Sequence, residues 1–160
     1  MKDIPRIASF TVDHDLITPG IYISRIDADV VTYDLRTRTP NTGALMDNAT
    51  MHSVEHMFAT YIRASAIGEK VLYFGPMGCQ TGFYLLVRDC EKEEVLKAIL
   101  SVLSAIVSHE GEMFGASRKE CGNYKNLSLP LAKAECARFL ALLEKKENTF
   151  AYPTKKENEK

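Results

Sequence analysis

Residues 71–87 read VLYFGPMGCQTGFYLLV, in which two short apolar runs flank a turn-forming segment. Segments 71–74 and 83–87 are rich in β-branched and aromatic residues, which is typical of strands. Between them, GPMGCQTG at 75–82 holds three glycines and one proline within eight residues, a composition that requires a tight turn. We therefore expect two strands joined by a turn that presents Cys79 to a pocket.

The chain before this pair predicts further strands and one helix. Segments 6–12, 21–26 and 30–35 alternate in polarity and are separated by turn-forming residues, which favours three short strands, the last two as a hairpin. An irregular loop at 36–48 then leads into ATMHSVEHMFATYIRASAI at about 49–67. This stretch lacks proline and glycine, and its apolar residues recur every three or four positions, which predicts a helix.

Two more helices are expected, at 91–108 and at about 128–145, because the apolar residues of each repeat with the spacing of one buried helical stripe. Cys136 falls on the second stripe, where a cysteine usually acts as a small buried hydrophobe. Strands followed by mixed strands and helices, without a strict βαβ alternation, indicate an α+β fold: a largely antiparallel sheet packed against a few helices in two layers. We expect one domain at 1–145 and a polar, flexible tail at 146–160.

The composition narrows the choice of partners and compartment. Twenty Lys and Arg against 21 Asp and Glu give a net charge of −1, with neither sign concentrated in one half, so a broad basic surface for nucleic acid is excluded. No apolar run approaches the roughly 20 residues of a membrane-spanning helix, and the N-terminus lacks a secretion signal. We expect a cytoplasmic protein that binds neither nucleic acid nor membrane, with reduced thiols at Cys79, Cys90, Cys121 and Cys136.

The strongest chemical signal is HSVEH at 52–56. At about 100° per residue, a helix places His52 and His56 on one face, about 40° apart, with Glu55 beside them. Two imidazoles one turn apart can bind one metal ion, and together with thiols they suit Zn²⁺ or Fe²⁺. On this motif alone, a metal site and an ordinary pair of surface or core histidines are about equally expected. The HxxEH order also occurs in the inverzincin peptidases, where the glutamate acts on a metal-bound water.

Two loop cysteines extend this candidate site. Cys79 lies in the glycine-rich turn and Cys121 directly precedes Gly122. One could be the third metal ligand and the other an acid or base, and their spacing does not decide which. A closed structural site of two histidines and two cysteines is an alternative. So is a peptidase-like zinc site in which Glu55 activates water, although it leaves the GPMGCQTG turn unexplained.

Five segments resemble, in this order and at compatible separations, the motifs of the S-ribosylhomocysteine lyase family, the autoinducer-2 synthases. They are SFTVDHD (9–15), YDLRTRTPN (33–41), MHSVEHMFATYIR (51–63), GPMGCQTGFYL (75–85) and ECGNY (120–124). The resemblance covers most of the chain, and the combination of HxxEH with PMGCxTGFYL is highly specific. It implies a homodimeric α+β enzyme with active sites at the dimer interface and one Fe²⁺ per subunit, for which Zn²⁺ or Co²⁺ can substitute.

The matched motifs imply three groups of site residues. The metal ligands would be His52, His56 and Cys121, the catalytic acid/base residues Glu55 and Cys79, and the substrate-binding residues Ser9, His14 and Arg36.

The reaction implied by the resemblance cleaves S-ribosylhomocysteine to homocysteine and 4,5-dihydroxy-2,3-pentanedione, the precursor of the quorum-sensing signal autoinducer-2. The sugar carbonyl moves from C1 to C3 in two proton-transfer steps before homocysteine is eliminated. Each step removes a proton beside a carbonyl, which suits a Lewis-acidic metal and two differently placed bases. The chain departs from the family pattern at Thr37, Ser65 and 73–75. These departures bear on substrate contacts and rate more than on the type of reaction.

Overall fold

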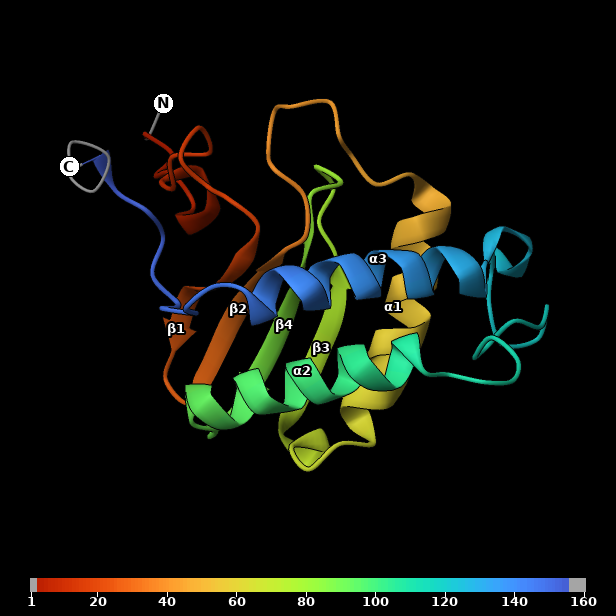
Figure 1. Ribbon diagram of the computed structural model, residues 1–160. Helices are drawn as coiled ribbons and strands as arrows, with labels where there is room; N and C mark the ends of the chain where they lie inside the picture. Colours follow the sequence, from red (N-terminus) through yellow and green to blue (C-terminus); the bar gives the residue numbers. More distant parts are fainter. Residues whose placement is uncertain (1–2, 156–160) are drawn as a thin grey trace.

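Four antiparallel strands form the sheet at the centre of the molecule (Figure 1). A computed structural model describes residues 3–155, and within them the strands are β1 (Gly20–Asp27), β2 (Val30–Arg36), β3 (Val71–Pro76) and β4 (Gly82–Arg88). They lie in the order β1-β2-β4-β3, so the two predicted hairpins are joined along β2 and β4. Arg36 pairs with Gly82, which brings the end of β2 beside the β3–β4 turn.

The α-helices of this part of the chain are α1 (Asn48–Arg63), α2 (Lys92–Val107) and α3 (Leu129–Glu144). In Figure 1, α2 and α3 cross one face of the sheet and α1 lies next to β3. Buried apolar side chains from all three helices and from the sheet form one core, which includes Cys136. The expected α+β fold, an antiparallel sheet packed against helices, is confirmed. None of the helices within residues 3–155 has the length and hydropathy needed to cross a membrane.

Helix α1 carries the HSVEH motif and is fixed at its start and along one face. The Asp47 carboxylate caps it by accepting a hydrogen bond from the Thr50 backbone N–H at 2.7 Å. Phe58 is 1% exposed and stacks on Phe74 of β3, with 4.3 Å between the ring centroids. Because this apolar face is turned to the core, the two histidines and the glutamate of the motif remain half-buried at the surface of the helix.

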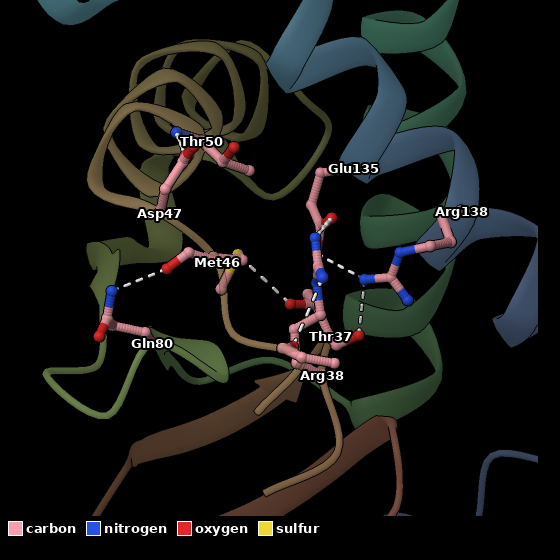
Figure 2. Close-up of polar contacts among 9 residues, drawn as sticks. Thr37, Arg38, Met46, Asp47, Thr50, Gln80, Glu135 and Arg138 are labelled. Carbon is pink, nitrogen blue, oxygen red and sulfur yellow. Dashed lines mark hydrogen bonds and ion pairs between the residues drawn. The ribbon is translucent and has the colours of Figure 1, made fainter. Parts of the chain in front are cut away.

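The loop between β2 and α1 is held from two sides (Figure 2). Glu135 of α3 accepts hydrogen bonds from Arg38 at 3.0 and 2.7 Å and from Arg138 at 2.6 Å. On the other side, the Gln80 side chain in the β3–β4 turn donates to the Met46 carbonyl at 2.8 Å, and the Met46 N–H donates to the Gln80 carbonyl at 3.0 Å. This loop therefore connects the Cys79 turn to the beginning of α1.

The prediction of a strand at 6–12 is wrong. This segment contains a short 3-10 helix at Ala8–Phe10, closed by a hydrogen bond from the Thr11 hydroxyl to the Ala8 carbonyl at 2.7 Å. Its alternating apolar residues face no covering layer in the described part of the chain, since Ile7 and Phe10 are 57% and 66% exposed. The alternation of polar and apolar residues predicted that one face of this segment is buried, but no other described part of the chain covers that face.

Residues after α3 return along the edge of β1. The Ile23 N–H donates to the Phe150 carbonyl at 2.8 Å, and the Phe150 side chain is 7% exposed within the core. Two residues later, Tyr152 stacks on Tyr22 with 4.8 Å between the ring centroids. The tail expected from residue 146 onward thus contacts the sheet at least as far as Tyr152. Residues 156–160 of that expected tail lie outside the described residues.

Candidate metal centre and thiol pocket

His52, His56 and Cys121 converge at one place. One ligand atom from each lies within 4.8 Å of the other two, and the Cys121 Sγ is 3.3 Å from the His52 Nε2. Within residues 3–155 no other set of three His, Cys, Asp or Glu side chains meets in this way. Cys79 does not belong to the group, so the described residues do not form the alternative closed site with two cysteines.

The second nitrogen of each imidazole is already engaged. The His52 Nδ1–H donates to Asn126 Oδ1 at 2.5 Å, and the His56 Nδ1–H donates to the Phe114 carbonyl at 2.9 Å. Each histidine therefore keeps Nε2 available as a ligand atom, as metal-binding histidines do when a second partner fixes their tautomer. Two imidazole nitrogens and one thiolate suit Fe²⁺, Zn²⁺ or Co²⁺, and three protein ligands leave a position open for substrate. These residues can hold a metal ion.

The surroundings of both histidines are themselves constrained. Asn126 donates from its side-chain Nδ2 to Asn48 Oδ1 at 2.6 Å, which fixes the amide so that its oxygen faces His52. Gly115 has a positive φ of 63°, and a Cβ at this position would lie 2.9 Å from His56 Nδ1. A glycine is therefore required for the loop to pass this closely over His56.

A second group of candidate residues surrounds Cys79. Ser9, His14, Arg36 and Cys79 line one cavity of about 360 Å³, together with Phe10, Pro76, Met77, Gly78 and Tyr84. The structure thus brings together the three residues expected to bind substrate and one of the two expected to move protons. The Cys79 side chain is exposed to this cavity.

Arg36 is the buried charge of this cavity. Its Nη1 donates to Thr81 Oγ1 at 2.7 Å and lies 3.7 Å from the Cys79 Sγ. On its other side it forms a two-point contact with Asp34, from Nε at 3.1 Å and Nη2 at 2.6 Å. Burial acts to lower the pKa of Arg36, but the hydrogen bonds and negative charge of Asp34 outweigh this and raise it. Arg36 is therefore a permanent positive charge beside the thiol.

The metal group and the Cys79 cavity are separate within one chain. Among the described residues, the lining of the Cys79 cavity includes none of His52, Glu55, His56 and Cys121. Cys121 instead lines another cavity, of about 380 Å³, with residues 118 and 122–125. Glu55 lies between the two histidines on α1 and is half-buried. The residues expected to act on one substrate are thus divided between two places.

Some of the residues that support the site were not identified from the sequence. Asp34 could have been, because it is two positions from Arg36 on a strand and therefore shares its face. Asn126 and the Phe114 carbonyl carry no local signal, since each meets its histidine across more than 50 positions of chain.

Known proteins resemble this chain over nearly its full length. Residues 7–150 match the family described as S-ribosylhomocysteinase (LuxS). A protein from Borreliella afzelii named S-ribosylhomocysteine lyase is 43% identical, over 92% of this chain and 99% of its own. Proteins of the same name from Clostridium acetobutylicum and Phocaeicola vulgatus are 41% and 42% identical, covering 92% and 97% of this chain and 98% and 99% of their own. The chain belongs to the S-ribosylhomocysteinase (LuxS) family.

Proposed function

We propose that this protein is an S-ribosylhomocysteine lyase, which releases homocysteine and 4,5-dihydroxy-2,3-pentanedione. The observation that carries the proposal is the convergence of His52, His56 and Cys121, with both imidazoles oriented by a second hydrogen bond. A cavity lined by an exposed thiol and a buried guanidinium accompanies it. Both features belong to a chain about 40% identical to proteins that bear this name.

His52, His56 and Cys121 would hold one Fe²⁺ per subunit, with Zn²⁺ or Co²⁺ as substitutes. When bound, the metal supplies a Lewis acid that stabilises negative charge on an oxygen of the substrate. The half-buried position of the three side chains supports this role, because it leaves one side of the group accessible to a small molecule.

Cys79 and Glu55 would move the protons. In each carbonyl shift the carbon beside the carbonyl loses a proton and the carbonyl oxygen gains one. The neighbouring hydroxyl then loses its proton to become the new carbonyl, and the former carbonyl carbon gains a proton. In the last step the proton leaves C4 while the C5–S bond breaks, and homocysteine departs with the electron pair of that bond. The Cys79 thiolate, beside the Arg36 charge, can take the proton from one carbon and return it to the next, while the Glu55 carboxylate beside the histidines can carry a proton between the two oxygens.

Ser9, His14 and Arg36 would bind the sugar portion of the substrate, because all three line the Cys79 cavity. The His14 Nδ1–H donates to the Val12 carbonyl at 2.9 Å, which leaves Nε2 to accept a hydrogen bond from a hydroxyl. Arg36 uses Nε and Nη2 on Asp34, so its Nη1 side faces the thiol and the substrate.

The active unit would be a homodimer in which the Cys79 cavity of one chain faces the metal group of the other. Two observations support this arrangement: the two half-sites line different cavities in one chain, and large apolar side chains are exposed near the Cys79 cavity. Phe10 in the lining of that cavity is 66% exposed, and Ile7, three residues before it, is 57% exposed. A second chain covering them would remove this apolar surface from water.

Product identification tests the proposed function. The protein, loaded with Fe²⁺ under anaerobic conditions, is incubated with S-ribosylhomocysteine, and the products are identified by mass spectrometry. We expect homocysteine and the pentanedione in equal amounts. Homocysteine accompanied by intact ribose would instead indicate hydrolysis of the C–S bond, and would contradict a lyase.

A further inference from the structure

A series of hydrogen bonds connects the segment after α3 with the Cys79 cavity. The Tyr152 hydroxyl donates to Asp34 Oδ2 at 2.7 Å, and the same oxygen accepts from Arg36 Nη2 at 2.6 Å. Arg36 in turn lies 3.7 Å from the Cys79 Sγ. Two side chains, those of Asp34 and Arg36, thus connect the Tyr152 hydroxyl with the Cys79 thiol, although Tyr152 and Cys79 are 73 positions apart in the sequence (152 − 79).

Within this series, the Asp34–Arg36 ion pair is the contact whose stability depends on further hydrogen bonds. Asp34 and Arg36 are 0% and 3% exposed, so water does not hold either charge in place. A buried ion pair is favourable only when further hydrogen bonds satisfy the remaining donor and acceptor positions and its geometry is fixed. Tyr152 supplies such a bond to the carboxylate oxygen that also holds the guanidinium, and it thereby limits rotation of the carboxylate.

Tyr152 is well placed and in the right protonation state for this role. Phe150 has a positive φ of 63°, which interrupts the regular alternation of an extended chain. Its side chain packs in the core against Tyr33, whereas the Tyr152 side chain stacks on Tyr22. Burial, followed by the negative charge of Asp34, raises the pKa of Tyr152, so the hydroxyl stays protonated and donates. Tyr152 lies two positions beyond the segment matched by the family model, which ends at residue 150.

We propose that Tyr152 is a positioning residue, which orients Asp34 so that Arg36 faces Cys79 and the cavity. The segment after α3 would then be part of the active site without touching the substrate. The inference rests on the proposed function only where it concerns substrate binding by Arg36. The effect of Tyr152 on the Cys79 thiol is independent of the reaction.

The test compares two Tyr→Phe variants of the full-length protein. Tyr152→Phe keeps the ring and its stacking on Tyr22 but removes the hydroxyl. Tyr22→Phe is the matched control, because it keeps the same ring pair and removes a hydroxyl that donates to the Thr18 carbonyl at 2.7 Å instead. The readout is the rate at which iodoacetamide alkylates Cys79 at neutral pH, followed by peptide mass spectrometry.

We expect Tyr152→Phe to slow alkylation of Cys79 about threefold to tenfold, because Arg36 is less often beside the sulfur and the thiolate is less stabilised. Tyr22→Phe should react like the wild type. Equal unfolding midpoints for the two variants would exclude a general loss of structure as the cause. A wild-type alkylation rate in Tyr152→Phe would overturn the inference.

A double-mutant cycle asks whether Tyr152 acts through Arg36. In an Arg36→Lys background, which lacks the two-point contact with Asp34, adding Tyr152→Phe should slow alkylation no further. The same slowing in both backgrounds would exclude action through Arg36. In lyase assays Tyr152→Phe should raise KM as well as lower kcat. A wild type without lyase activity would contradict the proposed function, whereas the alkylation rates would still decide the role of Tyr152.

Discussion

The Cys121 sulfur lies 3.3 Å from Nε2 of His52, although 69 positions separate the two residues in the chain. His52 is in the first half of α1, whereas Cys121 lies in the connection between α2 and α3. Packing of the helices on one another returns this connection to α1, and the hydrogen bond between His52 and Asn126 holds it there. The metal group is thus produced by the tertiary fold and not by the HSVEH motif alone.

Replacing each loop cysteine should separate metal binding from proton transfer. Cys121→Ala should lose most of its bound metal, because the thiolate is the softest of the three ligands. Cys79→Ala should keep the metal and lose turnover by about 10²–10⁴-fold, because a proton-transfer group is missing. Metal per chain and thiol release, measured on both variants, check this prediction. Metal-free Cys79→Ala protein would identify Cys79 as a ligand.

Removing the partner of His52 should weaken metal binding without removing a ligand. Asn126→Ala leaves the Nδ1 side of His52 without its acceptor, and loss of such a contact typically costs about 10–100-fold in metal affinity. Titration with Co²⁺, followed by its absorption spectrum, measures the change. Asn148→Ala is a suitable control, since Asn148 donates to the Leu143 carbonyl at the end of α3. An unchanged affinity in Asn126→Ala would show that this hydrogen bond does not orient the ligand.

Two inactive variants should complement each other if the site is shared between chains. Ser9 lines the Cys79 cavity and Glu55 lies beside the metal group, so a mixed dimer of Ser9→Ala and Glu55→Gln would contain one site with both residues intact. We expect part of the wild-type turnover to return on mixing. Absence of any recovery, in samples where native mass spectrometry shows mixed dimers, would place each site within one chain.

Stability should depend on the charge of Glu135. Burial acts to raise its pKa, but hydrogen bonds from Arg38 and Arg138 and their charges outweigh this and lower it below 4.5. The ionised carboxylate therefore stabilises the fold above the unfolded-state pKa, and this contribution is lost as the pH falls through the lowered folded-state pKa. Glu135→Gln should lower the free energy of unfolding by about 1.5–3 kcal/mol at neutral pH.

Chemical denaturation of wild type and Glu135→Gln at several pH values measures this effect. The difference between the two should be largest at neutral pH and should decrease in the acidic range below pH 4.5, where the wild-type carboxylate becomes protonated. A difference that does not change with pH would mean that packing of the side chain, and not its charge, stabilises α3 against the loop.

Local patterns predicted most of the fold. The hairpins, the three helices and the burial of Cys136 follow from periodicity and turn residues, which act over a few positions. The segment at 6–12 has the same alternation as a strand, but neither a neighbouring strand nor a covering layer is available to it in the described chain. Phe150 was assigned to a polar tail because the segment from residue 146 onward is mostly polar and shows no apolar periodicity, and its place in the core is a long-range contact.

The candidate site was predictable to a similar degree. The two histidines were identified by their spacing on a helix, whereas Cys121 was selected by its resemblance to a family motif. Their meeting at one point agrees with that choice. Asn126 and Tyr152 act across the fold and have no pattern in the sequence near their partners. Side chains that act by orienting other side chains are therefore identified only from the folded structure.

Thiol release from S-ribosylhomocysteine tests the central claim most directly. Protein purified anaerobically with Fe²⁺ is mixed with excess substrate, and free homocysteine is followed with a chromogenic thiol reagent in quenched samples, beside Cys79→Ala at the same metal content. We predict many turnovers for the wild type and a loss of about 10²–10⁴-fold for the variant. No release of homocysteine by the metal-loaded wild type, or equal release by both proteins, would contradict the account.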